Sequence, residues 1–387
     1  MMGNKTMSRR ERVLAALQHR EPDRVPMHMT ITVDAYKNLK AHMGIDVEED
    51  LKVGRWTGVP IHPAVADAFG LDVIRLPNPL DKGKNKPALR DPEAAFIDEW
   101  HCQWYEVPRP GGGFYYEMKN PPLANATVDD LDDFPWPEPE EVAEGAEERF
   151  RETRENTDLA IMTKIGGAVF ELATYMRGMQ RWYTDLALNP EFAGALMAKI
   201  AEIQAQRDIN ALKVVGKSID ILRLSGEDMG TQERPLISPK MFNDLVRPHL
   251  QKVWTTAKEA LLAENPQGKI MLHSCGSVRP FIEDWIEMGL DALDPIQVSA
   301  KGMDTAELKE SFGERLVFHG GVDTQQVLPF GTPEDVRQEV RKRIKDLAPG
   351  GGYILAPVHN VQGDVRPENL IAMRDAVEAF GTYPIDL

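Results

Sequence analysis

Short apolar, β-branched runs alternate with longer amphipathic segments along this chain, most clearly after residue 155. The pattern predicts parallel strands, each followed by a polar turn and a helix. The runs lie at 25–30, 72–76, 159–165, 219–224, 269–273, 292–296, 316–319 and 353–356. Eight such strands in 387 residues predict an α/β protein with a closed (β/α)8 barrel, the TIM barrel, and an open doubly wound sheet is the alternative.

Three helix starts are marked by a capping residue followed directly by a proline. They are Asn189-Pro190, Ser238-Pro239 and Thr332-Pro333. A short polar side chain accepts hydrogen bonds from the first free backbone N–H groups, and proline is preorganised for the first helical position. We therefore predict that helices begin at these three points.

The region of about 95–140 interrupts the alternation of strands and helices. Residues 96–107 and 114–118 flank Gly111-Gly112-Gly113 and predict an antiparallel hairpin that carries His101 and Trp104. We expect it to be an insertion over the barrel mouth, in which these two side chains serve packing. No repeat or second domain is apparent, so residues 1–387 are predicted to form a single barrel domain.

The charge balance narrows the choice of partners. The chain has 61 acidic and 45 basic residues, a formal net charge of -16, which opposes binding to nucleic acid or to an anionic membrane surface. It has no apolar run of about 20 residues and no apparent signal peptide. Its two cysteines, Cys102 and Cys275, exclude a disulfide framework. We expect a cytoplasmic protein with a small-molecule substrate.

The strongest chemical motif is His273-Ser274-Cys275-Gly276, directly after the strand at 269–272. Residues two apart in an extended chain point to the same side, so the imidazole and the thiol can meet one ion. This ligand pair suits zinc, and barrel enzymes place catalytic groups at the carboxyl ends of their strands. A packed cysteine beside a hydrogen-bonded histidine is the structural alternative.

The segment Leu272-His273-Ser274-Cys275-Gly276 resembles the His-x-Cys-Gly block of the corrinoid-linked methyltransferase branch of the uroporphyrinogen decarboxylase superfamily. Further segments resemble other superfamily blocks. They are Arg20-Glu21-Pro22-Asp23-Arg24-Val25-Pro26, Ser238-Pro239-Lys240-Met241-Phe242, Phe318-His319-Gly320-Gly321-Val322-Asp323 and Arg366-Pro367-Glu368-Asn369-Leu370. The resemblance covers most of the chain outside the insertion, and it too implies a (β/α)8 barrel.

Two branches of the superfamily differ in chemistry. The decarboxylases carry an Arg-Gln-x-Gly-Arg loop and a Ser-Asp strand end, and this chain contains neither. The methyltransferases use His-x-Cys and a later cysteine as zinc ligands, and the zinc activates a thiol substrate. The chain resembles that branch more closely, although its later position holds His359 in place of cysteine.

The resemblance to the methyltransferases therefore implies a zinc site formed by His273, Cys275 and His359. His359 also matches a histidine of the decarboxylases, so a catalytic role without metal is open. Glu227 and Asp228 follow the strand at 219–224, where they can complete the metal shell or act as acid or base. The chain lacks an Asp-x-His-x-x-Gly cobalamin loop, so a partner protein would supply any corrinoid.

Other polar residues near strand ends are candidates for contact with substrate. Tyr175 matches a tyrosine that the decarboxylases place in their pocket, and Glu171 lies one turn earlier on the same helix face. Gln297 follows the predicted strand at 292–296, His319 ends the one at 316–319, and both are expected to bind substrate. Packing in the core or hydrogen bonding to the backbone is the structural alternative for each.

The resulting hypothesis is a zinc-dependent methyltransferase that moves a methyl group between a small methylated substrate or a thiol and a corrinoid protein. One alternative is a metal-free decarboxylase or lyase, in which Asp228, Tyr175 and His359 act while Arg24 and Arg177 hold carboxylates. Another is a noncatalytic partner protein. The resemblance also makes a homodimer plausible.

Overall fold

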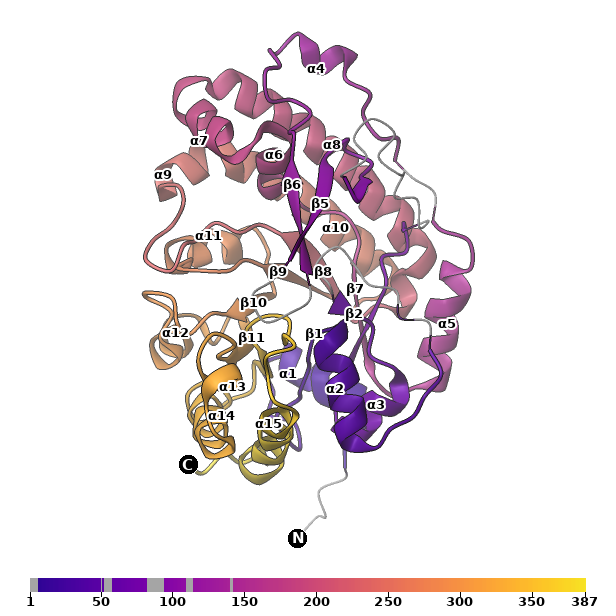
Figure 1. Cartoon of the computed structure of the whole chain (residues 1–387). Helices are drawn as coiled ribbons and strands as arrows, with labels where there is room; N and C mark the ends of the chain where they lie inside the picture. Colours follow the sequence, from indigo (N-terminus) through magenta and orange to yellow (C-terminus); the bar gives the residue numbers. More distant parts are fainter. Residues whose placement is uncertain (1–5, 50, 52–57, 82–93, 109–113, 140–141) are drawn as a thin grey trace.

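Seven parallel strands form one curled sheet in the computed structural model, which describes residues 6–49, 51, 58–81, 94–108, 114–139 and 142–387 (Figure 1). Neighbouring strands are adjacent in sequence order, apart from the insertion between the first two, as in a barrel of βα units. The strands, in spatial order, are β3 (Val73–Leu76), β7 (Ala160–Lys164), β8 (Ile221–Gly226), β9 (Lys269–His273), β10 (Ala292–Ile296), β11 (Val317–Val322) and β12 (Tyr353–Pro357).

An irregular segment fills the place of the eighth barrel strand. Met27 forms a parallel bridge with Leu355 of β12, and the Met27 carbonyl accepts a hydrogen bond from the Asp72 N–H, just before β3. The sequence predicted a continuous strand at 25–30, but this segment is irregular. Pro26 has no N–H, and the Met27 N–H donates to the Asp72 carboxylate. The (β/α)8 barrel predicted from the sequence is confirmed, with this one irregular strand.

Helices surround the sheet and link successive strands (Figure 1). The predicted helix starts are confirmed at Pro190, Pro239 and Pro333, with Ser238 and Thr332 capping through their side chains. The helices are α1 (Arg9–Leu17), α2 (Val33–Met43), α3 (Pro63–Phe69), α4 (Asp130–Asp133), α5 (Ala146–Asn156), α6 (Phe170–Arg177), α7 (Met179–Leu188), α8 (Pro190–Val215), α9 (Pro239–Met241), α10 (Arg247–Glu264), α11 (Ile282–Glu287), α12 (Thr305–Phe312), α13 (Val327–Phe330), α14 (Pro333–Leu347) and α15 (Pro367–Phe380).

The barrel interior changes from apolar to ionisable along the strands. Residues two apart in a strand face the same side, so each strand contributes one side chain to successive interior layers. The apolar layer packs against α1, which fills the amino end of the barrel. The ionisable layer lies two residues further on in five strands. The pairs are Val73 and Arg75, Ile221 and Arg223, Met271 and His273, Ala292 and Asp294, and Val317 and His319.

Strand β11 is longer than predicted, so the two glycines after His319 lie inside it instead of after it. Gly320 and Gly321 have φ values of 112° and 95°. A side chain at Gly320 would place its Cβ 3.0 Å from the backbone nitrogen of Ile296 in β10. Glycine is needed here because the register of β10 and β11 shifts where the two backbones approach.

The insertion is a three-stranded antiparallel sheet rather than the predicted two-stranded hairpin. Its strands are β4 (Phe96–Ile97), β5 (Gln103–Pro108) and β6 (Phe114–Lys119). The predicted first strand is split in two because the Asp98 carboxylate accepts the backbone N–H groups of Trp100 and Cys102 and so stabilises a turn. The three consecutive glycines of the predicted turn lie outside the described residues.

The insertion packs against α6 and α8, beside which β5 and β6 are drawn in Figure 1. The ring of Trp104 makes an edge contact with Tyr175 of α6, with 5.3 Å between ring centroids. The guanidinium of Arg207 in α8 lies over Trp100. Trp104 therefore serves packing, as expected, and it joins the insertion to the helix that follows β7.

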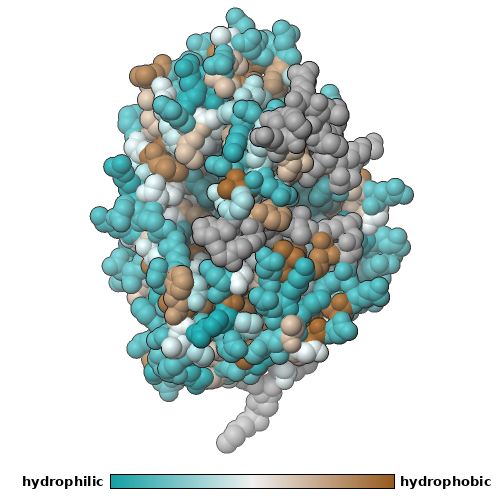
Figure 2. Space-filling model, viewed as in Figure 1, coloured by the Kyte–Doolittle hydropathy of each residue, from teal (hydrophilic) through white to brown (hydrophobic). Residues whose placement is uncertain are grey.

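The surface is mostly hydrophilic, as the face in Figure 2 shows and as the high charge content implies. Large exposed apolar side chains are scattered: Met179 and Leu188 lie on α7 and Phe330 lies on α13. Among the described residues, no helix combines the length and apolar character needed to cross a membrane. A homodimer stays a prediction.

A buried carboxyl group on α8 gives a prediction about stability and pH. Oδ1 of Asp208 accepts the Gly166 N–H at 3.0 Å, whereas Oδ2 of Asp208 and Oε1 of Gln204 have no hydrogen-bond partner among the described residues. Burial raises the pKa of Asp208 from 3.8 to about 7. A proton on Oδ2 would supply the donor that Gln204, one turn earlier, lacks.

We expect the free energy of unfolding to fall as the pH rises from about 4 through 7, because the folded state holds the Asp208 proton more tightly than the unfolded state. Asp208→Asn should remove this loss and exceed the wild type by about 1 to 3 kcal/mol at pH 9, with little difference near pH 4. Urea unfolding at several pH values measures the effect. The exposed Asp132→Asn is the control, and equal pH dependence of Asp208→Asn and wild type would contradict the assignment.

Candidate metal centre and active site

Three side chains that the sequence singled out as metal ligands meet at the carboxyl ends of the barrel strands. His273, Cys275 and His359 each offer one ligand atom, and these atoms all lie within 4.8 Å of one another. Sγ of Cys275 is 3.5 Å from Nε2 of His273, and the two histidine rings have centroids 5.9 Å apart. Residues far apart in sequence thus form a compact set of donors that zinc prefers.

Asp294 fixes the orientation of His273. Its Oδ2 accepts a hydrogen bond from Nδ1 of His273 at 2.9 Å, which leaves Nε2 free to face Cys275. Asp294 also binds Nδ1 of His319 at 2.8 Å and Nε of Arg223 at 3.0 Å. Although burial opposes it, the His319, Arg223 and His273 charges hold the pKa of Asp294 well below its usual range. A carboxylate at the rear nitrogen of a histidine is the arrangement that supports a metal ligand.

The backbone of the Cys275 loop is held by side chains from two neighbouring strand ends. The Cys275 N–H donates to Oδ1 of Asp228 at 2.9 Å, and the Gly276 N–H donates to Oε1 of Gln297 at 2.7 Å. Gly276 has a φ of 91°, and a Cβ there would lie 2.3 Å from the Gly230 carbonyl oxygen. Gln297 therefore positions the loop, and its carbonyl oxygen is engaged in that role.

The electrostatics of the cluster favour a cation. Burial, with Asp228 and Asp294 nearby, raises the pKa of the Cys275 thiol well above its usual range. Burial and the neighbouring His273 lower the pKa of His359 to about 4, so His359 is a neutral ligand near pH 7. Neutral imidazole can bind a metal, and a metal reverses the effect of the carboxylates on the thiol.

The adjacent carboxylates Glu227 and Asp228 have different positions. Glu227 is fully buried and accepts the N–H groups of Val169, Phe170 and Glu171 at the start of α6. It anchors that helix rather than facing the barrel mouth. The side chain of Asp228 is 46% exposed, and its Oδ1 lies 3.9 Å from Nε2 of His273. Asp228 alone of the pair can reach a metal or a substrate.

Helix α6 brings two further predicted residues beside the cluster. Tyr175 donates to Oε1 of Glu171 at 2.6 Å, and a Cβ at Gly226 would collide with Oε2 of Glu171. Burial and the charge of Asp228 raise the pKa of Glu171. Burial, Asp228 and Glu171 raise the pKa of Tyr183 to about 12. Glu171 and Asp228 therefore form an acidic wall next to the histidines and the cysteine.

His319 lies below the cluster and makes contacts within the protein through both ring nitrogens. Its Nδ1 faces Asp294, and its Nε2 is 3.0 Å from Nδ1 of His28. Burial and His319 lower the pKa of His28 well below its usual range. The sequence predicted that His319 binds substrate. In the structure its side chain is 4% exposed, and it supports Asp294 from the barrel interior instead.

The structure does not bring Arg24 and Arg177 to the site. Arg24 precedes the first barrel segment and binds Asp72 at the amino end, opposite the cluster. Arg177 is 1% exposed and donates to Asp185 while it stacks on Phe192. Both guanidinium groups have partners in the fold, so the structure does not support a role in gripping substrate carboxylates.

The sequence reasoning missed the groups that surround the predicted ligands. Asp294, Arg223, Arg75 and His28 are interior residues of barrel strands or of the segment before β1 (Ile31–Thr32), and Tyr183 lies on α7. The alternation within each strand held a usable signal, because an ionisable residue two positions after an interior apolar residue faces the same interior. Which of these groups bind one another could not be predicted, because the pairs join strands that come together only in the closed barrel.

Ionisable side chains gathered at the carboxyl ends of barrel strands are the arrangement of (β/α)8-barrel enzymes. The model of the uroporphyrinogen decarboxylase family matches residues 111–380, and the chain belongs to this family. The chain is 23% identical over 278 residues to the uroporphyrinogen decarboxylase of Psychromonas ingrahamii, covering 69% of this chain and 73% of that protein. It is 25% identical over 230 residues to the same enzyme of Methylococcus capsulatus, covering 58% and 60% of the two chains.

A solved structure of a methyltransferase from Methanosarcina mazei has a similar fold. The TM-score is 0.64 at 18% sequence identity, and the match covers 97% of this chain and 99% of the methyltransferase. This similarity confirms the barrel fold over nearly the whole chain. Together with the family match, it confirms the expectation of a member of the uroporphyrinogen decarboxylase superfamily.

Proposed function

We propose that the protein is a zinc-dependent methyltransferase that moves a methyl group between a small substrate or thiol and a corrinoid carried by a partner protein. The observation that carries the proposal is the meeting of His273, Cys275 and His359, with ligand atoms within 4.8 Å of one another. The hydrogen bond from Nδ1 of His273 to Asp294 adds to it, because it leaves Nε2 available to a metal.

The ligand set fits a catalytic zinc site. Two imidazoles and one thiolate are donors that zinc accepts, and three protein ligands leave a fourth position for an exchangeable group. Zinc, when bound, would lower the pKa of a thiol and thereby supply a nucleophile at neutral pH. Asp228, 46% exposed beside His273, is the carboxylate placed to occupy or border that position.

The other residues would hold the site and receive protons. Asp294 keeps His273 in the tautomer with Nε2 facing the cluster. Glu171, whose pKa is raised by burial and Asp228, can take up a proton near Tyr175. Glu227 anchors α6 and so places Glu171 and Tyr175 beside the metal ligands.

Methyl transfer from methylcobalamin to a thiol tests the proposal directly. The zinc-loaded wild type should consume methylcobalamin in a thiol-dependent reaction, followed by its visible absorbance. The Asp228→Asn variant should keep zinc and lose about tenfold or more in rate if Asp228 borders the reacting groups. Cys102→Ala, at the buried cysteine of the insertion, should react like the wild type. No thiol-dependent consumption by a zinc-loaded protein would contradict methyl transfer to a thiol.

A metal-free decarboxylase is the second candidate, favoured by the names of the relatives. Asp228, Tyr175 and His359 would act on a carboxylated substrate in this case. Glu171 and Tyr175 form a hydrogen-bonded pair next to Asp228, so a group able to donate a proton is present. Release of carbon dioxide from uroporphyrinogen by metal-free protein would support this function and contradict the first.

A further inference from the structure

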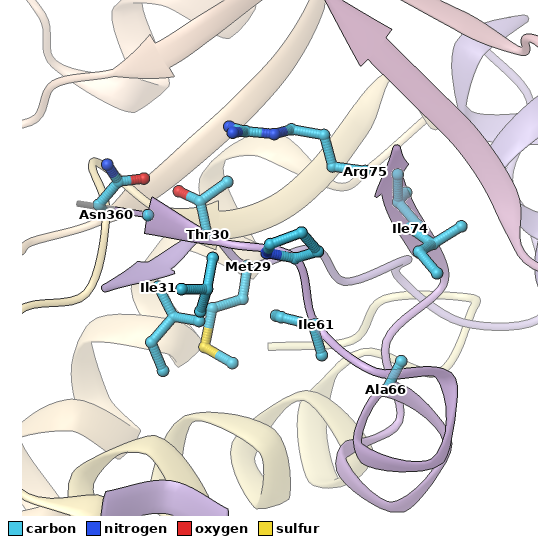
Figure 3. A pocket seen from close by; sticks show the side chains of 12 residues that line it. Met29, Thr30, Ile31, Ile61, Ala66, Ile74, Arg75 and Asn360 are labelled. Carbon is cyan, nitrogen blue, oxygen red and sulfur yellow. The ribbon is translucent and has the colours of Figure 1, made fainter. Parts of the chain in front are cut away.

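One arginine in the barrel mouth forms no ion pair with any carboxylate in the described part of the chain. Arg75, in β3, makes no hydrogen bond or ion pair with any of the described residues, and its side chain retains solvent access. It lines a pocket with Thr30 and Asn360, and Figure 3 shows its guanidinium reaching across the pocket toward these two residues. Arg75 therefore presents its donors to the space above the barrel core.

Comparison with the other interior and buried arginines makes Arg75 unusual. At the amino end of the barrel, Arg12 and Arg24 share Asp72, and Arg154 binds Asp220. In the interior layer that contains Arg75, Arg223 binds Asp294. Removing a guanidinium from water without an anion is costly, which explains the carboxylate partners of these arginines. Arg75, whose side chain is exposed to solvent, has no carboxylate bound to it among the described residues, and it lies at the end of the barrel where catalytic groups gather.

The charges at the barrel mouth favour the binding of one more negative group near Arg75. Arg75 and Arg223 both interact with Asp294, but the carboxylate of Asp294 is already bound to Arg223, His273 and His319. Partial desolvation and the like charge of Arg223 lower the pKa of Arg75 to about 10, so it still carries a positive charge near pH 7. An incoming anion would offset the repulsion between the two guanidinium groups.

Two residues link Arg75 to the candidate metal centre. Asn360, on the wall of the same pocket, directly follows His359 in the chain. Asp294, which interacts electrostatically with Arg75, holds the ligand His273. A small molecule bound at the metal centre would thus have its remote end within the field of Arg75.

We propose that Arg75 is the substrate-binding residue for a carboxylate, and that the substrate is a small carboxylic acid whose other end reaches the His273, Cys275 and His359 cluster. A guanidinium with free donors binds a carboxylate through two parallel hydrogen bonds, which selects for charge and for orientation. The link to a thiol or methylated group at the far end rests on the proposed function. The assignment of Arg75 as the anion-binding residue does not.

Binding of 3-mercaptopropionate and of neutral 3-mercaptopropionamide to the zinc-loaded protein tests the proposal by calorimetry. The wild type should bind the acid about 10 to 100 times more tightly than the amide, because only the acid forms charge-assisted hydrogen bonds with Arg75. Arg75→Gln should lose this preference and keep its affinity for the amide. Arg75→Lys should keep part of the preference, and the exposed Arg181→Gln should keep all of it.

Two controls separate the possible failures. The zinc content and thermal unfolding of each variant are measured first, so that a folding defect is not read as lost binding. Propionate, which has no thiol, is then titrated into metal-free protein. Arg75-dependent propionate binding without any zinc binding would support the anion site and overturn the zinc mechanism. Equal affinity of the wild type for acid and amide, or a preference that survives in a folded Arg75→Gln, would overturn the role of Arg75.

Discussion

Replacing either His273 or Cys275 with alanine is expected to abolish stoichiometric zinc binding. The wild type, prepared without chelator, should contain about one zinc per chain, because three neutral or anionic donors converge at one point. Removal of one of the three donors should weaken zinc binding by about a thousandfold or more. Elemental analysis after dialysis measures the stoichiometry, and competition with a chelator measures the affinity.

Cys102→Ala is the matched control for Cys275→Ala. Cys102 is the other cysteine of the chain, and it is buried in the insertion. Its replacement should leave zinc binding unchanged. His359→Ala adds a third test, because it removes the ligand from the distant strand end without touching the His-x-Cys loop. A wild type that contains no zinc, or a Cys275→Ala variant that keeps it, would exclude the proposed metal site.

Asp294→Asn is expected to weaken both the fold and the zinc site. Arg223 would lose its buried counter-ion, and such a loss costs about 3 to 5 kcal/mol of the free energy of unfolding. His273 would lose the carboxylate that holds its tautomer, and zinc affinity should fall by about 10- to 100-fold. Urea unfolding and chelator competition measure the two effects on the same preparation.

A double variant separates the two roles of Asp294. Adding Arg223→Met removes the unpaired charge, so most of the lost stability should return. Zinc affinity should stay low, because His273 still lacks its carboxylate partner. If zinc affinity also returns, the loss in Asp294→Asn was a consequence of unfolding, and Asp294 does not position His273.

The sequence predicted the local features that depend on neighbouring residues. The strands at 269–273 and 292–296 match β9 and β10 residue for residue, and the helices begin at the predicted prolines. Hydrophobic alternation and capping are local, so they are readable without a fold. The segment 25–30 was harder, because its irregularity comes from a distant carboxylate, that of Asp72.

In the candidate site, too, the local features were predictable and the contacts between distant residues were not. The His-x-Cys spacing alone brought the first two ligand candidates to one side of the chain, and the resemblance added His359. The roles of Glu227, Gln297, Arg24 and Arg177 could not be predicted, since each depends on which distant backbone or charged group it contacts. In the sequence, for example, Glu227 and Asp228 appear equivalent. In the structure, the Glu227 carboxylate accepts backbone N–H groups at the start of α6.

The sequence by itself therefore determined the barrel, the position of its polar end and the candidate ligand pair His273 and Cys275, because period-two alternation and loop spacing are encoded locally. Only the tertiary structure decided which charges are compensated. In the closed barrel, Asp294 binds His273, His319 and Arg223, and no carboxylate of the described residues binds Arg75. Such pairing depends on distances between strands that are far apart in the chain, and those distances exist only once the barrel has closed.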